Sequence, residues 1–172
     1  MRTLMVSTLI ICCVTLLSCS DDAGEPMGPD NGINPTLPIA PNFTLLNTEL
    51  EETMLTDFSG KIVLLDFWAT WCKPCEEEIP IFIELYNDYR AQGFEIVGIS
   101  LDDERLTVVE PYIERLGVNY TILLGEAELI GLYNVTVMPS AFLINRDGQI
   151  VKPFHGAQGD RETYEKELKK LL

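Results

Sequence analysis

The chain has 172 residues, 47% of them hydrophobic, and its formal net charge at pH 7 is −15. This length and apolar content suffice for one globular domain with a sizeable core and exclude a disordered chain. The excess of acidic residues argues against nucleic-acid binding, which requires a basic surface.

The chain begins with a short basic stretch followed by an apolar run from Leu4 to Leu17. Such a run is too short to cross a membrane comfortably and suits the hydrophobic region of a signal peptide. It ends in Leu16-Leu17-Ser18-Cys19, which resembles the bacterial lipobox, a motif whose cysteine is lipidated. We therefore expect a lipoprotein signal peptide over residues 1–18 and lipidation at Cys19. The alternatives are an ordinary secretory signal and a buried hydrophobic helix.

The next segment, residues 19–40, is expected to be a flexible tether. It is rich in Asp, Asn, Gly and Pro and shows no hydrophobic periodicity, a composition typical of linkers. A coil of this length spans about 25 Å, so the domain can work at some distance from a membrane anchor. The folded domain is expected over residues 41–172.

The first predicted elements lead to one central strand. A short strand at Phe43–Leu46 and an extended stretch at Thr53–Leu55 come first, and a turn follows at Asp57–Gly60. The run from Ile62 to Trp68 is mostly apolar, as expected for a strand that is buried on both faces of a sheet.

Two cysteines separated by two residues follow this strand, in Trp71-Cys72-Lys73-Pro74-Cys75, and a helix-like run from Glu76 to Tyr89 comes next. A CxxC pair at a strand-to-helix junction is typical of a redox motif. The free N–H groups and the dipole of a helix N-terminus favour a thiolate, which is the species that attacks disulfides. We therefore expect Cys72 to be the attacking thiol and Cys75 to close a disulfide with it.

Two other roles for the pair are less favoured. A structural disulfide across so short a loop constrains the unfolded chain little. Half of a zinc site would need two further Cys or His ligands, but after Cys75 the chain has no cysteine and only His155. Cys12, Cys13 and Cys19 lie in or beside the apolar N-terminal segment. We therefore expect no metal site, and we take His155 to be structural or exposed.

The remaining pattern alternates between strands and helices. The helix after the cysteines should be kinked or shortened by Pro80. The later expected elements are a strand at Phe94–Leu101, a helix at Val108–Leu116 closed by Gly117, a strand at Tyr120–Leu124, a helix at Glu126–Tyr133, a strand at Ser140–Asn145, a hairpin turn at Asn145–Gly148, a strand at Gln149–Phe154 and a helix at Asp160–Leu172 capped by Asp160. This order predicts one α/β domain with a mixed sheet.

Several stretches carry a family resemblance: the lead-in Gly60 to Trp68, the CxxC, the sequence Cys75-Glu76-Glu77-Glu78-Ile79-Pro80, the additional segment Glu104 to Tyr133, and Val137 to Ile144. With them the chain, from roughly Ala40 to Leu172, resembles the thioredoxin superfamily, and within it the TlpA/ResA-like envelope thiol-disulfide oxidoreductases (AhpC/TSA-redoxin-like domain). The resemblance implies a thioredoxin-like fold. Its central mixed β-sheet is flanked by helices, and a strand-helix segment is inserted before a cis-proline.

The resemblance also implies roles for individual residues. In the family the residue before the cis-proline pairs its backbone with substrate and the proline packs beside the dithiol, so these roles fall to Met138 and Pro139. Trp71 is expected to contact substrate as well. No cofactor is expected.

Two acids match family positions that serve the second cysteine as a proton acceptor, Asp66 and Glu78. Buried carboxylates have raised pKa values and can exchange protons near neutrality. Asp66 lies on an apolar strand, so we expect it to be the principal acceptor. Glu78 has an alternative role as a solvated member of a Glu run at a helix N-terminus. Gly98 stands about where thioredoxin has the Lys that pairs with its Asp.

The expected function is that of a membrane-tethered thiol-disulfide oxidoreductase in the bacterial cell envelope, lipid-anchored and facing the periplasm or the exterior. We expect it to act as a disulfide reductase. By resemblance, the substrates are disulfide-containing envelope proteins, with apocytochromes c (cytochrome c biogenesis) among the candidates, and a DsbD/CcdA-like membrane protein donates electrons.

Two alternatives remain. A thiol peroxidase of the peroxiredoxin type needs Thr three residues before its reactive cysteine and Pro seven residues before it, and Ala69 and Leu65 occupy these positions relative to Cys72. A copper-delivery protein of the thioredoxin fold typically uses CxxxC together with a His. Here the spacing is CxxC, and His155 lies far along the chain.

Overall fold

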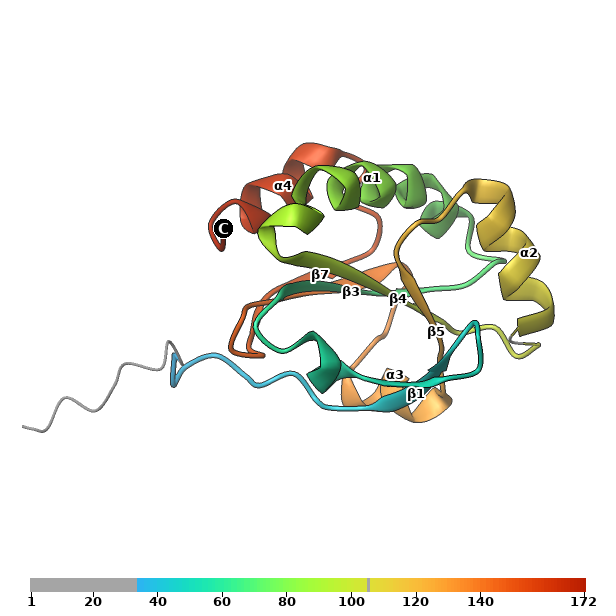
Figure 1. Ribbon diagram of the computed structural model, residues 1–172, viewed down its shortest axis with the longest axis horizontal. Coiled ribbons are helices and arrows are strands. Elements are labelled where there is room, and N and C mark those ends of the chain that lie inside the picture. The colour runs from blue at the N-terminus through green and yellow to red at the C-terminus, as the bar shows by residue number, and fades with distance from the viewer. Residues whose placement is uncertain (1–33, 105) are drawn as a thin grey trace, which may run out of the picture. The chain divides into compact units, whose positions relative to one another are not determined.

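The computed structural model describes residues 34–104 and 106–172 (Figure 1). The expected signal peptide, the lipidation site Cys19 and most of the expected tether lie outside these residues. Within the described ranges, no helix combines the length and the apolar character that a membrane span requires.

One mixed seven-stranded sheet forms the framework of the described residues, in the order β2-β1-β5-β4-β3-β6-β7. Its strands are β1 (Thr44–Asn47), β2 (Glu52–Met54), β3 (Ile62–Trp68), β4 (Phe94–Ser100), β5 (Thr121–Leu124), β6 (Ser140–Ile144) and β7 (Ile150–His155). Strands β3, β4 and β5 run parallel, and β1, β2, β6 and β7 are antiparallel to their neighbours. Every residue of β3 is buried, as its apolar sequence predicts.

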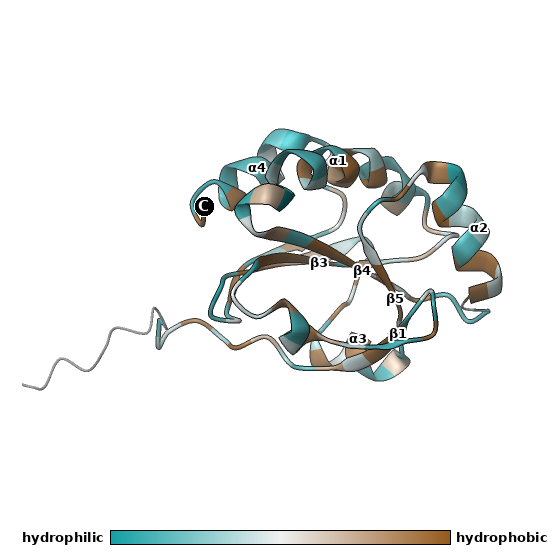
Figure 2. Ribbon diagram, in the orientation of Figure 1, coloured by the Kyte–Doolittle hydropathy of each residue, from teal (hydrophilic) through white to brown (hydrophobic). Residues whose placement is uncertain are grey.

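Helices cover both faces of this sheet (Figure 1). They are α1 (Lys73–Tyr89), α2 (Leu106–Leu116), α3 (Ala127–Leu132) and α4 (Arg161–Leu168), with short 3-10 turns η1 (Leu55–Phe58) and η2 (Arg90–Gln92). Successive side chains of β3 point to opposite faces of the sheet, so the core has two parts. Leu64 and Trp68 pack in the cluster beneath α1, α2 and α4, whereas Leu65 and Phe67 pack in the cluster on the α3 side. Figure 2 shows the apolar central strands between these layers.

The predicted central mixed sheet with flanking helices is confirmed. The predicted segment before residue 139 supplies α2, β5 and α3, and β5 enters the sheet between β1 and β4. Asp160 caps α4, where its carboxylate accepts a hydrogen bond from the backbone N–H of Thr163 at 2.8 Å, as predicted.

Pro80 is expected to kink or to shorten the helix after the cysteines, and the second of these two effects does not occur. Helix α1 begins at Lys73 and continues through Pro80 to Tyr89. The N–H that proline lacks would have bonded to the carbonyl of Glu76, so the helix gives up one hydrogen bond there. Packing of Ile79 and Phe82 into the core on either side of this position holds the helix together.

The end of the expected tether contacts the β6–β7 hairpin of the folded domain. The backbone N–H of Ala40 donates to the carbonyl of Gly148 at 2.9 Å. The backbone of Asn34 exchanges two hydrogen bonds with the side-chain amide of Gln149, at 3.0 and 2.6 Å. Residues 34–40 therefore belong to the folded unit, since the hairpin provides partners for their backbone polar groups.

Candidate active site

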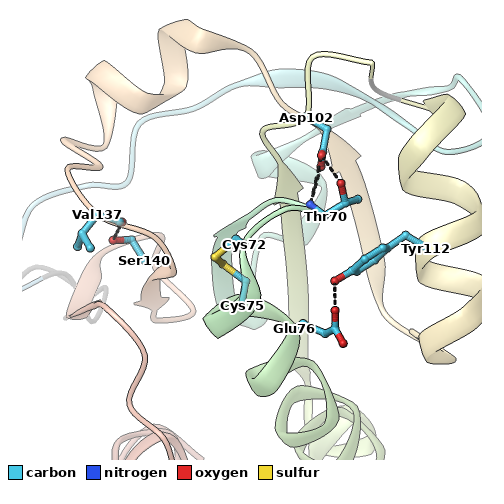
Figure 3. The surroundings of a disulfide bond; sticks show 8 residues. All are labelled: Thr70, Cys72, Cys75, Glu76, Asp102, Tyr112, Val137 and Ser140. Atoms are coloured by element: carbon cyan, nitrogen blue, oxygen red, sulfur yellow. Dashed lines mark hydrogen bonds between the residues drawn. A yellow bond between two sulfur atoms is a disulfide. The ribbon is translucent and has the colours of Figure 1, made fainter.

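The two cysteines of the CxxC lie where β3 gives way to α1 and are joined as a disulfide (Figure 3). Cys72 is the N-cap of α1, and its carbonyl accepts the first helical hydrogen bond from the N–H of Glu76 at 3.1 Å. Pro74 occupies the first turn, where the N–H it lacks would have no helical partner. Cys72 is 6% exposed and Cys75 is 2% exposed, so Cys72 is the more accessible residue of the pair.

A buried carboxylate holds the loop between β3 and Cys72. Asp102 accepts hydrogen bonds from the backbone N–H of Thr70 at 3.0 Å and from its hydroxyl at 2.6 Å, and Figure 3 shows both. The hydroxyl of Ser100 donates to the same carboxylate at 2.8 Å. Sequence reasoning missed Asp102. The sequence does carry one signal for it. Asp102 comes just after β4 and Thr70 just after β3, and the ends of neighbouring parallel strands meet at one edge of a sheet.

The Met138–Pro139 peptide bond is cis, in agreement with the resemblance. The β3–β6 register pairs Phe67 with Ser140 and so brings this segment beside the end of β3. Figure 3 shows Val137 and Ser140 on the side of the disulfide opposite to Thr70. Met138 packs against the core cluster that contains both cysteines.

Two apolar side chains near the disulfide face solvent: Trp71 is 67% exposed and Val137 is 45% exposed. Trp71 immediately precedes Cys72, and Val137 belongs to the cis-proline segment. Large apolar side chains with this much exposed surface are available for contact with another molecule.

Asp66 lies on the face of β3 that carries Leu64 and Trp68, and therefore beneath the helix that bears the cysteines. The side chain is 2% exposed, and its Oδ1 has no hydrogen-bond partner among the described residues. Burial first, and then the nearby charge of Glu78, raise the pKa of Asp66 well above its ordinary value. Asp66 is thus a buried acid on the dithiol side of the sheet.

Glu78 is also buried, with 1% of its surface exposed, so its alternative role as a solvated helix residue is wrong. Its Oε1 accepts hydrogen bonds from the backbone N–H of Gln158 at 2.7 Å and from the hydroxyl of Tyr164 at 2.8 Å. Its Oε2 is buried and unpaired within the described part of the chain. Burial raises the pKa of Glu78, and these hydrogen bonds to the charged form, together with the nearby backbone N–H of Gly159, oppose the rise.

No lysine neutralises Asp66 from the adjacent strand. Gly98 is its register partner on β4. A Cβ at position 98 would lie 2.7 Å from Cδ1 of Ile122 and 3.0 Å from Nε1 of Trp68, so these side chains occupy the space above the glycine.

Two charged residues in the first turn of α1, Lys73 and Glu76, lie largely outside the core. The ammonium of Lys73 lies 3.3 Å from the carboxylate of Glu76, and the Lys73 side chain is 71% exposed. The hydroxyl of Tyr112 donates to Glu76 at 2.7 Å and is the main reason that the pKa of Glu76 is lowered. Lys73 is therefore screened by solvent and by a nearby carboxylate.

His155 ends β7 opposite Ser140, and its Nδ1 lies 3.4 Å from the Ser140 hydroxyl oxygen. It is exposed, one of the two states expected for it. Across residues 34–104 and 106–172, no group of three or more His, Cys, Asp and Glu side chains is arranged to hold a metal ion.

Residues 38–152, about two thirds of the chain, match the model of the AhpC/TSA family. The chain belongs to the AhpC/TSA family. The family and the thioredoxin-like fold predicted from the sequence are thereby confirmed.

Relatives in this family specify the chemistry. The chain is 38% identical over 133 residues to thiol-disulfide oxidoreductase ResA of Bacillus thuringiensis, covering 77% of this chain and 76% of that protein. It is 41% identical over 118 residues to ResA of Geobacillus thermodenitrificans, covering 68% and 67%. A crystal structure of a thiol:disulfide interchange protein of the thioredoxin family, from Chlorobium tepidum, superposes with a TM-score of 0.72 at 26% identity, covering 81% of this chain and 99% of that one. The chain is accordingly a thiol-disulfide oxidoreductase of the AhpC/TSA family.

Proposed function

We propose that this oxidoreductase reduces disulfides in other proteins, with Cys72 as the attacking and Cys75 as the resolving thiol. The observation that carries this proposal is the disulfide at the N-cap of α1, with the more accessible of the two cysteines at the helix N-terminus. Exposed Trp71 and half-buried Met138 supply a contact surface for the substrate beside it, and the buried Pro139 packs behind Met138 in the cis-proline segment.

The proposed reaction has two exchange steps. In the first, the Cys72 thiolate attacks one sulfur of a substrate disulfide; a mixed disulfide forms and the other substrate sulfur leaves as a thiolate. In the second, Cys75 loses its proton and attacks the Cys72 sulfur, which forms the Cys72–Cys75 disulfide and releases the second substrate thiol. Two electrons pass from the dithiol to the substrate, and an external donor must restore the dithiol.

We assign the proton of Cys75 principally to Asp66, with Glu78 as a second acceptor. Cys75 and Glu78 are three residues apart on α1, and such residues are neighbours on one helix face. Asp66 approaches the same buried region from β3. An acceptor works best with a pKa near the operating pH, and burial moves both carboxyl groups in that direction.

We further propose that the enzyme acts as a reductant in the cell envelope, tethered to a membrane by a lipid on Cys19. The lipobox-like Leu16-Leu17-Ser18-Cys19 and the tether support this location. Disulfides persist in that compartment. Its substrates would be disulfide-containing envelope proteins, apocytochromes c among them, and a DsbD/CcdA-like membrane protein would supply electrons.

Trapping in cells tests the reaction and the partners together. Cys75→Ser should accumulate mixed disulfides with substrate proteins, because the resolving thiol is absent. Cys72→Ser/Cys75→Ser is the matched control and should accumulate none. Equal adducts in both variants would refute the assignment, and adducts formed by Cys72→Ser alone would exchange the roles of the two cysteines.

The anchor is tested independently. Cys19→Ala should lose the acyl modification and either leave the membrane fraction or remain unprocessed, whereas Cys12→Ala should be acylated like the wild type. Wild-type protein that is soluble and unacylated would refute the tether and leave the dithiol chemistry unaffected.

A further inference from the structure

The C-terminal part of the chain supplies two hydrogen-bond donors to Glu78, the buried acid on the CxxC helix. The segment between β7 and α4 contributes the backbone N–H of Gln158, and α4 contributes the hydroxyl of Tyr164. Both hydrogen bonds end on the same oxygen of Glu78, Oε1. The partners are 80 and 86 residues away in sequence, so the arrangement depends on the tertiary fold.

These two hydrogen bonds leave the second carboxylate oxygen of Glu78 without a donor among the described residues. Oε2 is buried and has no partner among the residues that the structure describes. Side chains of an α-helix lean toward its N-terminus, and for Glu78 that direction leads to the turn that carries Cys75. Fixing Oε1 from the α4 side therefore restricts the carboxylate to orientations in which Oε2 stays in the buried region of the dithiol.

We propose that Tyr164 is a positioning residue for the dithiol: its hydroxyl, together with the N–H of Gln158, orients Glu78 so that Oε2 can exchange a proton with Cys75. This inference rests on the proposed role of Glu78. The hydroxyl stabilises the charged form of Glu78 and so also sets the pH at which the acid becomes able to accept a proton.

The titratable groups that act on this pair come from several elements. Cys75 lies one turn before Glu78 on α1, Asp66 lies on β3, and Asp160, at the exposed N-cap of α4, acts on Tyr164. Tyr164 does not ionise near neutrality, because burial and the charge of Glu78 raise the pKa of its hydroxyl. Its influence is therefore that of a permanent hydrogen-bond donor.

Tyr164→Phe removes the hydroxyl and keeps the ring, which packs against Phe82 and Phe154. The matched control is Tyr89→Phe. Tyr89 of α1 also donates its hydroxyl to a glutamate across the α1–α4 interface, Glu165, but at the end of α1 far from the cysteines.

The measurement is the rate at which a preformed mixed disulfide on Cys72 is resolved, followed by stopped-flow between pH 5 and 9 with a small-thiol adduct. Tyr164→Phe should move upward, by about one pH unit, the acidic midpoint that Glu78 contributes to the profile, since a hydrogen bond to its charged carboxylate is lost. Tyr89→Phe should keep the wild-type midpoint. Tyr164→Phe combined with Glu78→Gln should match Glu78→Gln alone, because the hydroxyl then has no carboxylate on which to act.

The outcomes separate this inference from the proposed function. If Glu78→Gln shifts the profile but Tyr164→Phe does not, Tyr164 only packs and the inference is overturned. If Tyr164→Phe shifts the profile equally with and without Glu78, Tyr164 acts elsewhere and the inference fails. If Glu78→Gln changes nothing, the proposed role of Glu78 fails and the inference with it, while disulfide exchange by the cysteines stands.

Discussion

Asp102 holds Thr70 twice, through the backbone N–H and through the side-chain hydroxyl, two residues before Cys72. The carboxylate is 5% exposed and also accepts a hydrogen bond from Ser100. The loop that leads to Cys72 is thus fixed to the end of β4 by a partly buried polar contact. Breaking it is costly because the Asp102 carboxylate is desolvated.

Thr70→Val should lower the free energy of unfolding by about 1–2 kcal/mol, because Asp102 loses a charge-assisted hydrogen bond inside the protein. Urea unfolding of the oxidised protein measures this. Thr163→Val serves as the control, since its hydroxyl also donates to an aspartate, Asp160, but at an exposed helix cap. An equal decrease in the free energy of unfolding in both variants would show that the Thr70–Asp102 contact stabilises the protein no more than an exposed helix cap does.

Cys72 should be alkylated before Cys75 when the reduced protein meets iodoacetamide at neutral pH. Cys72 is the N-cap of α1 and the less buried of the two cysteines. The free N–H groups of the first turn lower the pKa of a thiol placed there. Peptide mapping after a short exposure reveals the order, and first labelling at Cys75 would contradict the proposed roles.

Asp66→Asn should slow resolution of the mixed disulfide at pH 7 more than Glu78→Gln does. The Oδ1 of Asp66 has no partner within the described residues, whereas Glu78 already accepts two hydrogen bonds on Oε1, which favour its charged form and weaken it as a base. Stopped-flow with the same adduct compares the two rates. The opposite order would transfer the principal role to Glu78.

The oxidised protein should lose stability as the pH rises from about 4 into the neutral range. The pKa of Asp66 is raised in the folded state, so the folded protein holds this proton where the unfolded chain has released it. Stability from such a group is complete below the unfolded pKa and is lost as the pH passes through the folded pKa. Urea midpoints at several pH values measure the slope.

Asp66→Asn should flatten that slope, because an amide has no proton to hold. The exposed Asp103→Asn should keep the wild-type slope. Wild-type stability that rises between pH 5 and 7 would contradict the burial argument for Asp66.

The reduction potential should be near that of thioredoxin, about −250 mV or below. Two buried acids beside the dithiol oppose negative charge on sulfur and so favour the disulfide, whereas Lys73 is 71% exposed and paired with Glu76. Equilibration with dithiothreitol or glutathione gives the potential. A value near −120 mV would instead describe an oxidant with a strongly stabilised thiolate.

Local patterns in the sequence predicted much of this structure because they act over a few residues. The apolar run Ile62–Trp68 predicted the central strand, and the CxxC spacing at its end predicted the disulfide at the start of a helix. The cis bond before Pro139 came only from the family resemblance, since trans is the usual form of an X–Pro bond.

Contacts between distant segments could not be obtained from the same patterns. Nothing in the Glu run of α1 indicates that Glu78 is buried, because its burial depends on Tyr164 and Gln158, which arrive from the far end of the chain. Asp102 was missed for the same reason, since its partner Thr70 lies 32 residues away. Pro80 does not end α1, because the cost of one lost helical hydrogen bond is outweighed by packing of the whole helix.

The space around Gly98 restricts which side chains can replace this glycine. A lysine there would give Asp66 a countercharge, but its Cβ alone would meet Ile122 at 2.7 Å and the indole nitrogen of Trp68 at 3.0 Å. A single substitution would therefore overpack the core before any ion pair formed. A paired Asp–Lys site at this place therefore needs a smaller or displaced side chain at 68 or 122 as well as the lysine, so at least two positions are involved.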